Sequence, residues 1–201
     1  MKFCSQCGGA LVRKVPNDDD RQRFVCEACG IIHYQNPKIV TGCLVLQGDR
    51  VLLCKRAIEP RHGFWTVPAG FMELNETAQQ GAQRETWEEA RARVEILGPY
   101  SMINLPHVNQ IYMIFRARLL NPDFRPGPES LEVGLFEERD IPWDELAFHT
   151  VRNTLRFYFE DRARGAFPFR AGTILADDGR FRYQAEPDDQ LVVNAGTIRH
   201  G

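Results

Sequence analysis

The 201-residue sequence contains no apolar run of the ~18 residues that a membrane-spanning helix needs. Its N-terminal stretch, MKFCSQCGG, also has no apolar core of the kind found in signal peptides. The formal net charge is only −2, so there is no global basic footprint for nucleic acid. We therefore expect a cytoplasmic protein with neither a membrane nor a nucleic acid as its partner.

The cysteine distribution argues against a disulfide framework. Four of the six cysteines form two C-x-x-C pairs: Cys4, Cys7, Cys26 and Cys29. The other two, Cys43 and Cys54, lie in apolar, strand-like runs, where a free cysteine behaves as a small buried hydrophobe. We interpret these two as core residues, because a disulfide between them is disfavoured in a reducing compartment.

The two cysteine pairs predict a structural zinc site. Each pair closes with a glycine, Gly8 or Gly30, and an 18-residue gap separates the pairs. Two residues between cysteines let both thiolates reach one ion, and four thiolates leave a tetrahedral Zn²⁺ no open position. A redox pair or an iron–sulfur centre is the rival interpretation. We expect His33 to be a surface or linker residue.

Local patterns predict strands mixed with two helices, and hence an α/β domain. The expected strands cover 39–47, 51–57, 64–68, 93–105, 109–120 and 132–137. The expected helices cover 77–91 and about 149–164. We divide the chain into a zinc ribbon at 1–34, a main domain at 38–165 and an extension at 166–201. The extension is either a partly ordered arm or a strand that caps a partner.

The first helix carries an unusual cluster of negative charge. At 100° per residue, Glu85, Glu88 and Glu89 share one face, where they repel one another and oppose the helix dipole. Arg84 compensates one carboxylate, and the remaining hard oxygen ligands suit Mg²⁺ or Mn²⁺. A solvated acidic face is the alternative.

The opposite face of this helix favours close packing on a sheet rather than full exposure to solvent. It carries small residues at every fourth position: Ala78, Ala82, Thr86 and Ala90. Gly81 fits the same close approach. Thr77 and Gln80 form a candidate capping box, with Asn75 as a rival cap.

The spacing of these residues resembles the Nudix box, G-x5-E-x7-R-E-U-x-E-E-x-G-U, where U is an aliphatic residue. The matching residues are Gly70, Glu76, Arg84, Glu85, Glu88 and Glu89. Thr86 and Ala92 stand where aliphatic residues are usual, and Arg91 replaces the glycine that normally ends the helix. The resemblance implies an α/β/α Nudix sandwich with a mixed sheet, and leaves two ways for the helix to end. Either Arg91 adopts a strained left-handed conformation, or the helix continues for another turn.

The resemblance also implies roles for individual residues in a metal-dependent pyrophosphatase. Glu85 and Glu89 would be catalytic metal ligands, helped by Glu88 and the Ala69 carbonyl. The structural positions of the box would be Gly70, Glu76 and Arg84.

Other residues are expected around this centre. Glu129 is the first candidate for the general base and Glu132 the second. Arg56 would meet a phosphate, and Tyr112 would stack on a substrate ring. Phe71 is expected in the core.

The order of a zinc ribbon and a Nudix-like domain resembles NADH pyrophosphatases, which carry an S-Q-P-W-P-F-P-x-S motif after the box. The corresponding stretch here, SMINLPHVNQ, departs from that motif. The following region looks instead like the bacterial and plant group associated with FAD and ADP-ribose pyrophosphatase activity. That resemblance implies cleavage of FAD to FMN and AMP, or of ADP-ribose to AMP and ribose 5-phosphate, by a homodimer. The alternatives are an NADH pyrophosphatase, a non-catalytic nucleotide sensor and a zinc-ribbon nucleic-acid adaptor.

Overall fold

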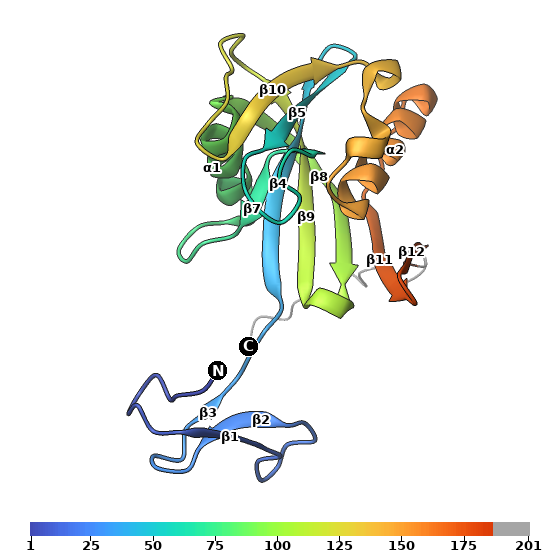
Figure 1. The fold of residues 1–201 in the computed structure, drawn as a ribbon. Coiled ribbons are helices and arrows are strands. Elements are labelled where there is room, and N and C mark those ends of the chain that lie inside the picture. Colours follow the sequence, from blue (N-terminus) through green and yellow to red (C-terminus); the bar gives the residue numbers. More distant parts are fainter. Residues whose placement is uncertain (187–201) are drawn as a thin grey trace, which may run out of the picture. The chain divides into compact units, whose positions relative to one another are not determined.

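The computed structural model describes residues 1–186, which separate into two compact units. The first unit is Met1–Pro37, and the second begins at Lys38. Figure 1 shows a small β unit at the N-terminus and a larger domain of strands and helices.

The N-terminal unit is a three-stranded antiparallel sheet. Its strands are β1 (Leu11–Lys14), β2 (Arg23–Cys26) and β3 (Ile32–His33), in the order β1-β2-β3. The glycine after each cysteine pair has a positive φ of 73° or 75°, which glycine adopts without steric cost. These turns close through backbone hydrogen bonds from Gly8 N–H to Cys4 O and from Gly30 N–H to Cys26 O. Both cysteine pairs thereby sit on equivalent tight turns.

A mixed sheet forms the centre of the second unit. Its strands are β4 (Lys38–Gln47), β5 (Arg50–Arg56), β6 (Trp65–Thr66), β7 (Ala69–Phe71), β8 (Val94–Leu105), β9 (Gln110–Leu119), β10 (Ser130–Phe136), β11 (Arg170–Asp177) and β12 (Arg180–Ala185). The main order is β10-β5-β4-β9-β8-β11-β12, with β6 beside β5 and β7 beside β4. The pairs β4–β9 and β8–β11 are parallel, and the other pairs are antiparallel.

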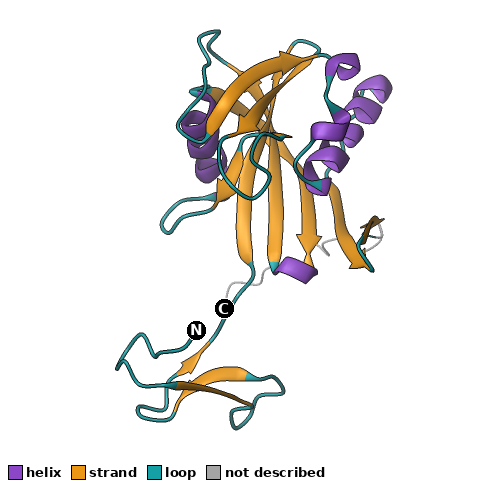
Figure 2. Cartoon of the chain, in the orientation of Figure 1, coloured by secondary structure: helices purple, strands orange, loops and turns teal. Residues whose placement is uncertain are grey.

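Two helices cover the sheet, one on each face. They are α1 (Ala78–Ala90) and α2 (His149–Arg164), and three short 3₁₀ turns lie at Pro106–Val108, Glu138–Asp140 and Trp143–Glu145. Figures 1 and 2 show the two helices on opposite sides of the strands. Each helix packs on its own hydrophobic cluster. Cys43 and Cys54 are buried free thiols in the α1 cluster, as predicted. The predicted α/β/α sandwich with a mixed sheet is confirmed.

Helix α1 begins and ends as its sequence suggests. The Thr77 side chain accepts a hydrogen bond from Gln80 N–H, and the Gln80 side chain accepts one from Thr77 N–H, which completes the capping box. Arg91 ends the helix in the left-handed conformation, with φ of 51°. Of the two expected endings, the structure has the strained one. At Gly81 a Cβ would lie 2.7 Å from the Thr41 side chain, so only glycine lets the helix approach β4 this closely.

The start of the C-terminal extension belongs to the main sheet. Strand β11 pairs in parallel with β8 of the same chain, and β12 returns antiparallel beside it. A buried carboxylate on α2, Asp161, accepts hydrogen bonds from the Tyr100 hydroxyl and from the Arg170 guanidinium at the start of β11. The hairpin 170–185 is therefore neither of the expected forms, an arm or a cap on a partner. The rest of the expected extension, 187–201, lies outside the described residues.

Candidate active site

Arg84 is the centre of the charged cluster on α1. Its Nε and Nη2 donate to the two oxygens of Glu76 at 3.0 and 2.7 Å. Its Nη1 contacts Glu85 at 2.7 Å and Glu88 at 3.2 Å. The hydrogen bonds from Arg84 lower the pKa of Glu76 to about 2. Arg84 thus ties the loop before the helix to the carboxylates on its face.

Glu89 lies next to this cluster but forms no ion pair with Arg84; the charge of Arg56 and a hydrogen bond from the Ala69 backbone offset its burial only in part. Its side chain is 6% exposed, and its Oε2 has no hydrogen-bond partner among the described residues. Burial raises the pKa of Glu89 to about 8, and the charge of Glu85 adds to the effect. A buried carboxylate without a partner is costly unless a cation joins it. This orphaned oxygen therefore fits the divalent ion that the glutamate pattern predicts.

The backbone of Gly70 on β7 lies against the glutamate cluster of α1. A Cβ at Gly70 would lie 2.4 Å from the Glu85 carboxylate, so the backbone there lies directly against this group. The neighbouring residue, Ala69, also lines the cavity described below. The carboxylate oxygens of the three glutamates do not lie as close to one another as the four sulfurs of the ribbon, and Arg84 Nη1 bonds to two of them, Glu85 and Glu88.

The Pro/Gly loop before β10 docks on the end of α1. Arg125 N–H donates to Ala90 O, and Gly127 N–H donates to Glu89 O, both at 2.9 Å. These bonds satisfy helix-end carbonyls that have no partner within the helix. A Cβ at Gly127 would lie only 1.7 Å from Glu88 O, so the loop can dock here only with glycine. The loop thereby brings Glu129 to the glutamate face.

The two candidate bases end in different places. Glu129 lines the same cavity as Glu85 and Glu89, and its charge contributes to raising the pKa of both. Glu132 does not line that cavity; it is exposed and lies 3.9 Å from Lys55. The structure therefore does not bring Glu132 to the candidate site, because β10 turns its side chain towards the surface.

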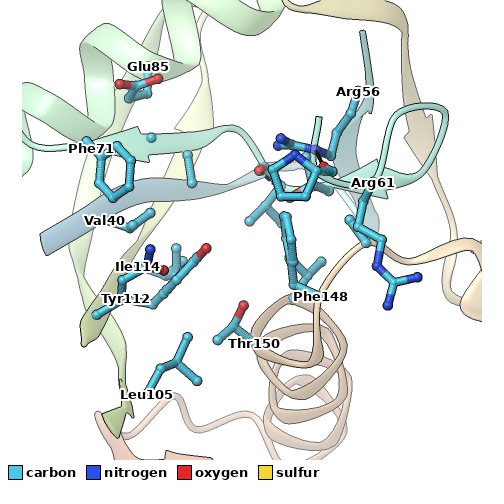
Figure 3. A pocket seen from close by; sticks show the side chains of 18 of the residues that line it. Val40, Arg56, Arg61, Phe71, Glu85, Leu105, Tyr112, Ile114, Phe148 and Thr150 are labelled. Atoms are coloured by element: carbon cyan, nitrogen blue, oxygen red, sulfur yellow. Dashed lines mark hydrogen bonds between the residues drawn. The ribbon is translucent and has the colours of Figure 1, made fainter. Parts of the chain in front are cut away.

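A cavity of about 690 Å³ extends from the glutamates across the sheet to the start of α2. Figure 3 shows Glu85 on the α1 side, with Tyr112 and Arg56 among the side chains around the open space. Both were expected at the site. The expectation that Phe71 is a core residue is wrong, because its ring is exposed on the cavity wall, with Lys38 Nζ 4.8 Å from the ring centroid. The short strand β7 ends here and leaves the ring uncovered.

Aromatic groups that sequence reasoning missed form the far end of the cavity. Phe181 of β12 stacks on His149 of α2, with ring centroids 4.4 Å apart, and lies 5.6 Å from the His107 ring. All three residues line the cavity. The alternation of residues 170–185 gives a weak strand signal. No local pattern indicates that this hairpin returns to the site.

The four predicted zinc ligands meet in the ribbon. The sulfur atoms of Cys4, Cys7, Cys26 and Cys29 all lie within 4.8 Å of one another. A hydrogen bond from the Cys7 backbone is the largest factor lowering the pKa of Cys4, to about 6, which favours the thiolate that binds metal. His33 is half-buried at the end of β3, and its Nε2 lies 3.3 Å from Cys4 Sγ. Four clustered sulfurs fit a closed tetrahedral Zn²⁺ site.

The sandwich, the glutamate helix facing a cavity and the four-cysteine ribbon define the class as a Nudix enzyme. The chain belongs to the Nudix family: a profile described as "NUDIX domain" matches residues 36–159, and one described as "Nudix N-terminal", a zinc ribbon, matches residues 2–35. Nudix enzymes use Mg²⁺ or Mn²⁺, so the predicted cofactors, this ion and a structural Zn²⁺, are confirmed at the level of the family.

Known proteins similar to the chain include one solved structure and two curated enzymes. A crystal structure of a NUDIX hydrolase from Nitrosomonas europaea is 55% identical, covers 87% of this chain and 99% of its own, and superposes with a TM-score of 0.85. The NAD-capped RNA hydrolase NudC of Photobacterium profundum is 34% identical over 65% of this chain and 47% of its own length. The human mitochondrial NAD(P)H pyrophosphatase NUDT13 is 28% identical over 84% of this chain and 45% of its own.

The chain spans about half the length of the curated relatives it matches.

Within residues 1–186, neither helix has the length and apolar character needed to cross a membrane.

Proposed function

We propose that the protein is a metal-dependent pyrophosphohydrolase that cleaves a dinucleotide of the NAD(P)H type into two mononucleotides. The observation that carries this proposal is the buried, unpartnered Oε2 of Glu89 at one end of a cavity that also has an aromatic end. One end suits a cation with the pyrophosphate, and the other suits a planar ring. A volume of about 690 Å³ lies within the usual range for small-molecule sites.

The residues present divide the work as follows. Glu85 and Glu89 would hold the divalent ion, with Glu88 and the Ala69 carbonyl beside them. When bound, that ion neutralises the pyrophosphate and lowers the pKa of the attacking water. Glu129 is proposed to accept the proton of this water; the docking of its loop on the end of α1 and its position on the cavity wall support this role.

Arg56 and Tyr112 are proposed to hold the substrate rather than to react with it. Arg56 Nε donates to Pro60 O, which keeps its guanidinium on the cavity wall, and its charge acts on Glu89 and Tyr112. A fixed guanidinium suits a phosphate, and the Tyr112 ring offers a flat apolar surface.

The proposed substrate class, NAD(P)H-type dinucleotides, rests on the names of the curated relatives. The names of both curated relatives quoted above refer to NAD caps or NAD(P)H. The sequence patterns alone favour FAD and ADP-ribose, and these substrates move to second place. The departure of SMINLPHVNQ from the motif of NADH pyrophosphatases keeps them as candidates.

A panel of substrates with Mg²⁺ tests the proposal: NADH, NADPH, an NAD-capped RNA, FAD, ADP-ribose and nucleoside triphosphates. We expect NADH or NADPH to have the highest kcat/KM, with NMN-type and AMP-type mononucleotides as products. Preferential turnover of FAD or ADP-ribose would instead support the second candidate. Hydrolysis of none of these compounds, with intact fold and zinc content, would refute a pyrophosphohydrolase.

A further inference from the structure

Helix α2 begins without a cap. Its N-cap residue is Phe148, whose side chain offers no hydrogen bond, and its first turn contains no acidic residue. Ser, Thr, Asp and Asn are the residues that normally occupy this position. In residues 1–186, nothing accepts a hydrogen bond from the N–H groups of His149, Thr150 or Val151. Helix α1 of the same chain, by contrast, has a complete capping box.

A second polar group at the same place is also without a partner. The Oγ1 of Thr150 makes no hydrogen bond in the described part of the chain, although the residue is only 3% exposed. Thr150 lines the cavity, and Figure 3 shows its hydroxyl oxygen pointing into it from the first turn of α2. Burying a hydroxyl without a partner is unfavourable, so this group is stable here only if something in the cavity bonds to it.

The surroundings are suited to an anion. The N-terminus of a helix carries a partial positive charge and points its free N–H groups outwards. Two cationic side chains, Arg56 and Arg61, line the same cavity, and Arg56 lies over the ring of Phe148 at 5.1 Å from its centroid. Burial lowers the pKa of His149, with Arg152 and Arg61 adding to the effect, which also indicates positive potential at this helix end. Apart from Glu129 and the glutamates proposed to hold the cation, the acidic residues that line the cavity are Glu59 and Glu73.

We propose that the N-terminus of α2, through the free N–H groups of its first turn and the Thr150 hydroxyl, binds a phosphoryl group of the substrate. This subsite rests on the proposed function, because it assumes a phosphorylated nucleotide in the cavity. It is separate from the glutamates, which would hold the cation. The bound phosphoryl group takes the place of the missing capping residue. Its source is either the pyrophosphate itself, if one of its phosphoryl groups reaches from the cation past Arg56 to α2, or a further phosphate, such as the 2′-phosphate of NADPH.

The test uses full-length protein and the isosteric variant Thr150→Val, which removes the hydroxyl but keeps the shape. Thr150→Ser restores a hydroxyl, and Thr86→Val is the matched control, a buried helix threonine on α1 that does not line the cavity. Binding of ADP-ribose is measured by titration calorimetry in magnesium-free buffer, where no turnover is expected. KM is measured for NADH and NADPH with Mg²⁺, and thermal unfolding for every variant.

We expect Thr150→Val to weaken ADP-ribose binding and to raise KM about 10-fold, as for the loss of one hydrogen bond to a charged group. Its thermal midpoint should equal or exceed that of the native protein, because an unpartnered hydroxyl is removed. Thr150→Ser should bind close to native, and Thr86→Val should keep native affinity. Equal losses for ADP-ribose, NADH and NADPH identify the pyrophosphate as the source. A loss confined to NADPH, with native affinity for ADP-ribose, identifies the further phosphate.

Unchanged affinity and KM in Thr150→Val would overturn the proposal, as would a lower thermal midpoint accompanied by normal binding. If no compound is hydrolysed but Thr150→Val still weakens ADP-ribose binding, the proposed function fails while the subsite stands. Normal hydrolysis with no effect of Thr150→Val leaves the function standing and removes the subsite.

Discussion

Replacing Glu89 by glutamine should stabilise the fold at high pH and at the same time abolish metal-dependent turnover. A pKa near 8 in the fold and 4.5 in the unfolded chain means that the folded protein keeps a proton that the unfolded chain releases. The contribution of Glu89 to the free energy of unfolding is therefore most favourable below about pH 4.5, and it is lost as the pH rises to about 8. Glutamine cannot ionise, so the free energy of unfolding of Glu89→Gln should not fall with pH in this way.

The size of the effect follows from the same two values. At about 1.4 kcal/mol per pKa unit, the difference between 4.5 and about 8 corresponds to about 5 kcal/mol. Water that enters the cavity screens part of it, so we expect Glu89→Gln to be about 2–5 kcal/mol more stable than the native protein at pH 8 without magnesium. At pH 5 the difference should fall to about 1 kcal/mol or less.

Urea unfolding at pH 5, 6.5 and 8, in magnesium-free buffer that leaves zinc in place, measures this difference. Glu88→Gln is the control, because the Glu88 side chain is half exposed and its replacement should change stability by less than about 1 kcal/mol. Added Mg²⁺ should stabilise the native protein but not Glu89→Gln, which should also lose turnover while retaining its fold and zinc. A variant that is less stable than native at pH 8, or a difference that does not depend on pH, would refute the reasoning.

Three further predictions address other parts of the molecule. Gly127→Ala should cost about 1–3 kcal/mol and lower kcat, because the added Cβ would meet Glu88 O and displace the loop that carries Glu129 from the end of α1; native kcat in this variant would contradict the docking. Arg91→Gly should stabilise the protein by about 0.5–1 kcal/mol in urea unfolding, since relief of the left-handed strain outweighs the lost contact with the Trp87 ring; a net loss would show that this contact dominates. Elemental analysis should find one zinc per native chain and little in Cys26→Ser, whose main domain should keep its thermal transition.

Local rules predicted the elements of the main domain well, because each of these elements has its signal in its own residues. The capping box at Thr77 marks the start of α1, and the glutamate spacing marks its charged face. Arg91, which stands where the Nudix box has glycine, led to two predicted endings for the helix, and the left-handed one is observed. The zinc cluster is equally local, since each cysteine pair is set by one turn.

The parts that sequence reasoning missed depend on distant segments meeting. Glu129 and Glu132 are three positions apart, and only the docking of their loop on α1 separates a cavity residue from a surface one. Phe181 reaches the cavity because β11 pairs with β8, a contact between segments about 70 residues apart. The missing cap of α2 was visible in the residue Phe148, but its meaning required the cavity in front of it. The expected homodimer stays a prediction, which size-exclusion chromatography with light scattering would test.

The pair Asp161–Arg170 sets a practical limit on how this protein can be shortened. The family profile ends at residue 159, and a chain cut soon after that point would look complete by alignment. A chain that ends at 165, just after α2, would retain Asp161, which is 1% exposed, without the guanidinium that neutralises it, and would leave one edge of β8 bare. Unpaired edges of this kind recruit other chains. Expression of residues 38–165 is thus expected to yield aggregates, whereas chains that extend through β12 should remain in solution.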